Sequence, residues 1–168
     1  MWTSLTKRAV ATVAAALTTA FVISADAAAQ DQHDLVFPSG VACDFALAVD
    51  IGAGGPRVDH SFTDANGNPV RILSTGVGNQ LTFTNLSNGA TTATPANGAV
   101  TNTVFNADGS QTVTLTGHNI LILFPTDVPA GPSTTLYVGR VVFTVDANGV
   151  TTLKSTSGTA TDICAAVS

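Results

Sequence analysis

The 168-residue chain contains no glutamate, one methionine and only six lysine and arginine residues together. Glutamate, lysine and methionine are strong helix formers, whereas the threonine, valine, glycine and asparagine that replace them favour strands and turns. The composition therefore predicts an all-β fold.

Positive charge is especially scarce beyond the first 29 residues. Arg57, Arg71, Arg140 and Lys154 face ten aspartates there, which gives a formal net charge of 4 − 10 = −6. Nucleic acids and anionic membrane surfaces are bound by clustered cations, which this chain lacks. We therefore expect no nucleic-acid partner and no binding to anionic lipid.

Several catalytic and cofactor motifs are also absent. The sequence has no G-x-G-x-x-G or Walker loop, no G-x-S-x-G and no C-x-x-C. The D-x-N-x-N stretch from Asp64 has Pro69 where a calcium loop needs glycine. These absences argue against a nucleotide cofactor, an α/β-hydrolase elbow, thiol redox chemistry and an EF-hand, and we expect no cofactor or metal.

Only one long apolar run occurs, at residues 9–24, and it follows Lys7 and Arg8. Its sixteen residues are fewer than the roughly 20 that span a bilayer, and small residues follow with A-x-A readings ending at Ala27 and Ala29. We interpret residues 1–29 as a signal peptide cleaved after Ala29, the alternative being an uncleaved anchor. The mature protein is then secreted or held at the cell envelope, without a membrane span.

The mature chain has room for one domain and holds two cysteines, Cys43 and Cys164. In an exported protein this pair most simply forms one disulfide, although two buried thiols are the alternative. We expect a flexible mature N-terminus at residues 30–42 and a single β-domain at residues 43–168.

Glycine-ended turns separate segments in which apolar residues alternate with period two. DANG at Asp64, PANG at Pro95, NADG at Asn106 and DANG at Asp146 fit type I turns with a G1 bulge, and SNG ends at Gly89. These turns predict hairpin tips in an antiparallel meander of about eight to ten strands. The meander would form a barrel-like domain, which we favour, or a sandwich.

A proline-rich loop at residues 126–133 interrupts the most apolar part of the chain. NILILF precedes it, and a long strand with Gly139 near its middle follows it. Because Pro129 and Pro132 fix φ, we interpret the loop as a stiff connection rather than a binding loop.

This part of the chain carries a resemblance. GHNILILFPTDVPAGPSTTLYVGRVVFTVD, the turn DANGV and the tail STSGTATDICAA resemble a group of small secreted proteins of actinobacteria that carry no assigned activity. The resemblance implies export and an all-β fold, and it brings no cofactor or site residue.

Three histidines are the obvious candidates for chemistry. We expect His33 in the flexible N-terminus, His60 on the apolar face of a strand and His118 as a turn cap. A secreted hydrolase or isomerase using His60 or His118 with an aspartate is the alternative function, and a metal held by both with Asp59 or Asp127 is a weaker one.

The favoured function is a non-catalytic secreted β-domain with a structural, interaction or ligand-binding role. We expect a monomer whose partner is a small apolar ligand or an envelope component. The alternative is that the side chains expected to line the ligand site simply fill the core. These candidate ligand-site residues are Phe45, His60, Phe62, Phe83, Tyr137 and Phe143.

Overall fold

The computed structural model describes residues 33–168, and the predicted signal peptide at residues 1–29 lies outside them. The described residues form ten strands and one short helix, so the all-β prediction is confirmed. None of their helices has the length and apolar character needed to cross a membrane. The elements are β1 (Leu35–Phe37), β2 (Leu47–Gly54), β3 (Arg57–Thr63), β4 (Pro69–Val77), β5 (Asn79–Asn85), β6 (Thr91–Thr94), β7 (Gly98–Phe105), β8 (Gln111–Leu123), β9 (Ser133–Val145), β10 (Thr151–Asp162) and α1 (Ile163–Ala166).

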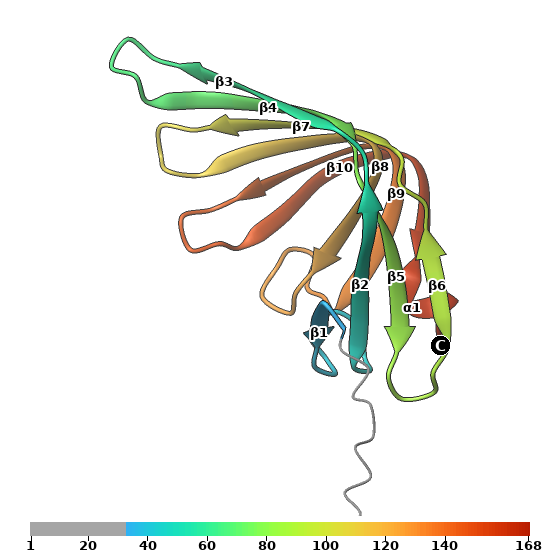
Figure 1. The fold of residues 1–168 in the computed structure, drawn as a ribbon. Helices are drawn as coiled ribbons and strands as arrows, with labels where there is room; N and C mark the ends of the chain where they lie inside the picture. Colours follow the sequence, from blue (N-terminus) through green and yellow to red (C-terminus); the bar gives the residue numbers. More distant parts are fainter. Residues whose placement is uncertain (1–32) are drawn as a thin grey trace, which may run out of the picture. The chain divides into compact units, whose positions relative to one another are not determined.

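The strands form two antiparallel sheets (Figure 1). The smaller sheet has the order β1-β2-β5-β6 and the larger has the order β10-β9-β8-β7-β4-β3. The barrel-like closure that we favoured is wrong, and the fold fits a sandwich. The reason is that the chain changes sheets after β2, β4 and β6. As a result β2 pairs with β1 and β5, and β1 does not pair with β10.

Most of the predicted turns are hairpin tips. The three tetrads starting at Asp64, Asn106 and Asp146 close the β3–β4, β7–β8 and β9–β10 hairpins, and the turn ending at Gly89 joins β5 to β6. In the first three, the glycine N–H donates to the carbonyl of the first residue at 3.0–3.1 Å.

The fourth tetrad, PANG at Pro95, is not a hairpin tip, and this prediction was wrong. It carries the chain from β6 in one sheet to β7 in the other. The Asn97 carbonyl accepts a hydrogen bond from Gly78 N (2.9 Å), which lies between β4 and β5. Two adjacent sheet-to-sheet connections therefore bond to each other instead of each folding back on itself.

A line of very small residues crosses five neighbouring strands of the larger sheet. Gly158 of β10 pairs with Gly139 of β9, which pairs with Gly117 of β8, and the line continues through Ala99 of β7 to Gly76 of β4. We call this row the glycine crease. Figure 1 shows β8, β9 and β10 curving part-way along their length, and their central glycines lie in the crease.

The crease requires glycine for two physical reasons. Gly117 and Gly139 have φ values of 98° and 151°, which L-residues with side chains rarely adopt. A Cβ on Gly139 would also overlap the carbonyl oxygen of Ser157 on the paired strand, and one on Gly117 would overlap that of Gly98. Neighbouring backbones therefore approach closely where the strands bend.

The first core cluster lies between the smaller sheet and the strands opposite it. Partly buried Ile120 and Ile122 of β8 and Leu136 of β9 pack against it, so the second half of β8 and the first half of β9 form the facing layer. Its buried members are Ala42, Cys43, Leu47, Val49, Phe83, Ile163 and Val167.

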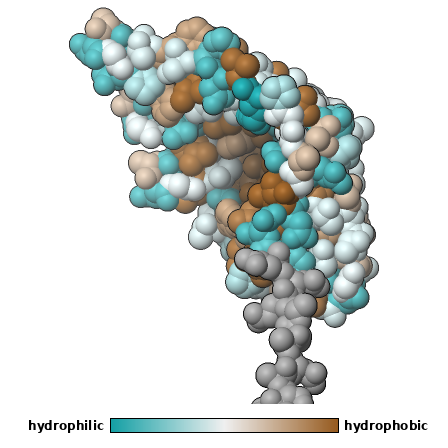
Figure 2. All heavy atoms as spheres, viewed as in Figure 1, coloured by the Kyte–Doolittle hydropathy of each residue, from teal (hydrophilic) through white to brown (hydrophobic). Residues whose placement is uncertain are grey.

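A second cluster uses the opposite face of the bent strands. Figure 2 shows apolar residues gathered in a hollow below the β3–β4 and β7–β8 hairpins, whose tips are mainly polar. Leu115 and Leu121 lie on either side of Gly117 and belong to the same cluster, so the bend gathers side chains from both halves of β8. Its buried members are Val113, Leu115, Leu121, Leu123 and Val141.

The predicted disulfide is confirmed. Cys43 and Cys164 are bonded across a sequence separation of 121 residues, with their Cα atoms 5.6 Å apart. On the loop-entropy model such a bond stabilises the fold by about 4 to 5 kcal/mol. It fastens the segment before β2 to α1.

The segment before Cys43 differs from the flexible terminus that we expected. Residues Leu35–Phe37 form β1 and pair with β2, and Ala42 is fully buried. His33 Nδ1 lies 2.9 Å from Asp50 Oδ1. Strand pairing and the His33–Asp50 hydrogen bond order a short segment that periodicity alone does not identify.

Replacing Gly139 with alanine tests the crease. Because the new Cβ meets backbone and the φ value is strained, we expect Gly139→Ala to lower the free energy of unfolding by about 2 to 4 kcal/mol in urea denaturation. Gly98→Ala is the matched control, since nothing lies within 4 Å of its Cβ position. The control should be neutral or stabilise by about 0.4 to 1 kcal/mol. Equal losses in the two variants would contradict the role of the crease.

Candidate functional site

Strand β7 pairs with β8 as far as Ala99 and Gly117; beyond this point the two sheets separate, and a pocket lies at this fork. On one side the chain crosses between the two sheets through the β2–β3, β4–β5 and β6–β7 connections. On the other side β8 and β9 continue past the glycine crease as one layer of the sandwich. Diverging layers leave a wedge that side chains only partly fill.

This fork pocket has a volume of about 310 Å³, at the lower end of the usual range for small-molecule sites. Both sides of the fork contribute to its wall. Its lining consists of Ile51, Arg57, Gly78, Asn79, Leu81, Thr94, Pro95, Asn97, Ala99, His118, Asn119, Ile120 and Leu136.

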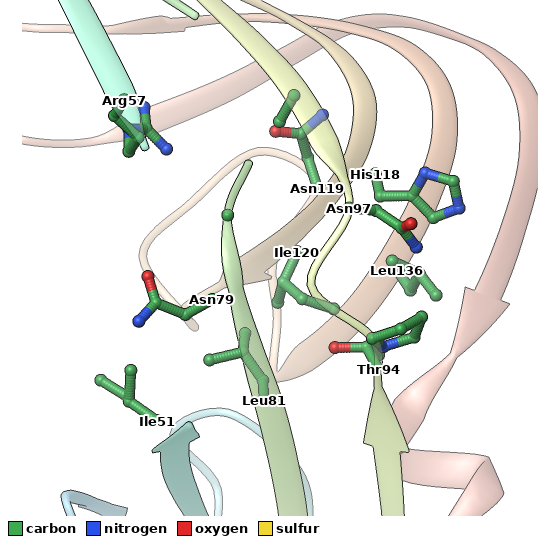
Figure 3. A pocket seen from close by; sticks show the side chains of 13 residues that line it. Ile51, Arg57, Asn79, Leu81, Thr94, Asn97, His118, Asn119, Ile120 and Leu136 are labelled. Carbon is green, nitrogen blue, oxygen red and sulfur yellow. The ribbon is translucent and has the colours of Figure 1, made fainter. Parts of the chain in front are cut away.

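The lining divides into a polar and an apolar part. In Figure 3, Arg57, Asn119, His118 and Asn97 lie along the upper rim, and Ile51 and Leu81 lie below them. Ile120 and Leu136 extend the apolar part from the opposite layer. The pocket is therefore amphipathic, with a polar rim beside a mainly aliphatic wall that also includes Asn79 and Thr94.

The rim carries a positive charge that no carboxylate of the described residues neutralises. Within residues 33–168 the one close contact between a basic side chain and a carboxylate joins His33 to Asp50, and no aspartate lines the pocket. Arg57 is exposed at the start of β3 and is the lining residue with a permanent charge. The chain has a formal net charge of −5, whereas the fork pocket carries a local positive charge.

One rim residue has an unsatisfied polar atom. The Nδ2 atom of Asn119 is enclosed, and none of the described residues accepts a hydrogen bond from it. An enclosed donor without an acceptor costs about 1–3 kcal/mol. Asn119 is therefore costly for folding, as residues at binding sites often are.

The carboxyl groups with perturbed pKa values lie elsewhere, at two hairpin tips. The pKa of Asp64 is lowered because the backbone N–H of Asn68 donates to it, with further help from the Asn68 side chain and from Asn66. The pKa of Asp108 is lowered by the Ser110 hydroxyl and then by its backbone N–H. Both shifts follow from turn hydrogen bonds, so they indicate structural carboxylates.

The aromatic side chains that we expected to line a ligand site are not brought together. Phe83 is buried in the first core cluster and Phe45 packs against it, whereas Tyr137 and Phe143 pack against the second. Phe62 is 45% exposed. None of these five aromatic residues lines the fork pocket.

His60 and Phe62 lie on β3, whose residues are all exposed. The Arg71 guanidinium stacks over the Phe62 ring at 5.1 Å from its centroid, and no second layer covers this face of the edge strand. The expectation that His60 belongs to a core face is therefore wrong.

The histidine–aspartate pairs of the hydrolase alternative are not formed among the described residues. His118 is exposed at the fork, and neither it nor His60 contacts a carboxylate in residues 33–168. Over the same range, no three histidine, cysteine or acidic side chains lie close enough to hold a metal ion.

Asp127 has a structural position. It is 5% exposed, and its Oδ2 accepts from Phe124 N (2.7 Å) while its Oδ1 accepts from Thr151 N (2.8 Å). Val128 also exchanges backbone hydrogen bonds with Thr151 and Leu153. The proline-rich loop is thus fastened to the start of β10, which supports its interpretation as a stiff connection.

Of the residues that line the fork pocket, only His118 was a candidate from sequence. Arg57, Asn79 and Asn97 lie in or beside the connections between sheets. The available signal was the clustering of chain-breaking residues at positions 52–56, 76–78 and 95–98. Such clusters mark turns and crossings alike, so they do not by themselves reveal a pocket.

Comparisons of the chain with protein-family models, curated proteins and solved structures find no significant match.

The substitution Asn119→Leu tests whether the unsatisfied amide of Asn119 lowers the stability of the fold. Because this substitution removes an unsatisfied donor, we expect the free energy of unfolding to stay unchanged or rise by about 1 kcal/mol. Asn85→Leu is the matched control, since the Asn85 Nδ2 donates to Val167 O (3.0 Å) and its Oδ1 accepts from Ser87 N (2.9 Å). The free energy of unfolding of this control variant should fall by about 2 kcal/mol or more in urea denaturation. A similar loss in Asn119→Leu would show that Asn119 has a structural partner.

Proposed function

We propose that this protein is a non-catalytic, exported β-sandwich that binds a small molecule in the fork pocket. The observation that carries the proposal is the amphipathic lining of that pocket, where Arg57, Asn97 and His118 lie beside an aliphatic wall. Ligand sites in proteins are typically concave and mainly apolar, with a few polar groups that fix orientation. The predicted signal peptide supports export, and the disulfide is compatible with it.

A binding role is favoured over the hydrolase or isomerase alternative. General base catalysis needs a base in reach of the substrate, and a histidine base is usually oriented by a carboxylate. The fork pocket contains His118 but no carboxylate, and the described residues provide His118 with no such partner. The groups present can bind and orient a ligand, so binding is the simpler function.

The ligand site proposed from the structure differs from the aromatic interior proposed from sequence. The aromatic side chains fill two separate cores or lie on β3, whereas the fork pocket offers Ile51, Leu81, Ile120 and Leu136. An apolar portion of the ligand remains part of the proposal, with a polar group added at the rim.

Saturation-transfer NMR with a panel of small amphiphiles tests this function. The panel contains butyl to decyl alcohols, amines and carboxylates, and a ligand of this size should bind with a Kd on the order of 0.1–1 mM. Asn97→Trp should abolish the transfer because the indole occupies the pocket. Ser61→Trp, which places the same side chain on exposed β3, should leave it unchanged. Transfer that is absent throughout, or that persists in Asn97→Trp, would refute the fork pocket as the site.

A further inference from the structure

We propose that the ligand of the fork pocket is a monocarboxylate with an unbranched aliphatic tail. This inference rests on the proposed binding function and specifies the class of molecule. The carboxylate would lie at the rim, against Arg57, and the tail would lie along the aliphatic wall.

The charge of the rim selects an anionic group. Arg57 contacts no carboxylate of the described residues, and the fork pocket contains no acidic side chain. A guanidinium presents paired N–H donors that match the two oxygens of a carboxylate. One cation suits a single negative charge, and a phosphate dianion would lack a second cation among the lining residues.

The Asn97 amide offers a further donor. No side-chain hydrogen bond among residues 33–168 occupies Asn97, whereas the Asn79 Nδ2 already donates to Gly52 O (2.9 Å) and the Asn119 Nδ2 is enclosed. His118 is exposed beside them and can donate from its ring. The rim therefore consists mainly of N–H donors, which is the complement of a group that only accepts hydrogen bonds.

The aliphatic wall of the fork pocket determines which kind of ligand tail fits. None of the lining residues is phenylalanine, tyrosine or tryptophan, so a flat ring would find no aromatic face to stack on. Ile51, Leu81, Ile120 and Leu136 instead provide branched aliphatic contacts. The volume of about 310 Å³ corresponds to roughly ten water molecules, which suits a chain of the size of octanoate.

Matched eight-carbon probes test the inference on the full mature chain. We expect octanoate to bind about tenfold more tightly than 1-octanol, and octylamine to bind more weakly than either, by isothermal titration or chemical-shift titration. Added salt should weaken octanoate binding and leave 1-octanol unaffected.

Two arginine variants assign the effect to the pocket. Arg57→Gln should weaken octanoate binding about tenfold without changing 1-octanol binding. Arg71→Gln is the control, since it changes the net charge by the same amount. Arg71 lies outside the pocket, where it donates to Asn102 Oδ1 and stacks over Phe62. Thermal unfolding of both variants establishes that they are folded.

Each contrary outcome has a distinct meaning. Equal binding of octanoate and 1-octanol, or equal losses in Arg57→Gln and Arg71→Gln, would overturn the carboxylate inference while the proposed binding function stands. Absence of binding by all three probes would overturn the inference as well. If the wider alkyl panel also failed to bind, the proposed function would fail with it.

Discussion

The glycine crease is the constraint on which the arrangement of the larger sheet depends. Where Gly117, Gly139 and Gly158 lie side by side, the neighbouring backbones leave no space for a Cβ. Strands of 12 or 13 residues can bend there without losing their pairing. Consequently a single β8–β9 pair serves two apolar clusters, one on each of its faces.

The fork is the second consequence of bending. As β8 and β9 continue into one layer of the sandwich, the chain connected to β3, β4 and β7 enters the other layer. The connections are short, since a single residue, Gly78, separates β4 from β5. At the fork, polar side chains of the connections and of β8 lie beside aliphatic side chains of both layers, so the pocket is amphipathic.

The sequence predicts local structure well because local chemistry determines it. Alternation in segments such as LAVDI and QLTFT, together with glycine-ended turns, locates strands and four hairpin tips correctly. Two lone cysteines after a predicted signal peptide are enough to predict the disulfide. Each of these inferences depends on residues close in sequence or on a pair without competitors.

Long-range relations are what the sequence did not reveal. PANG at Pro95 has the same turn chemistry as the hairpin tetrads, yet it crosses between sheets, because sheet membership depends on distant pairing. Period two shows that Val58, His60 and Phe62 share a face, but not whether another layer covers it. On β3 no layer does, so His60 is exposed, and the fork pocket combines residues from Ile51 to Leu136 that no local pattern connects.

The bond between Cys43 and Cys164 also determines how the molecule would carry a mechanical load. Strands β2 to β10 lie inside the covalent loop that this bond closes, whereas β1 and residues 165–168 lie outside it. Tension applied to the two ends would act on the β1–β2 pairing and would otherwise pass through sulfur instead of through the ladders of hydrogen bonds. The ladders that join β2 to β10 and the fork pocket would be shielded from shear for as long as that bond stays oxidised.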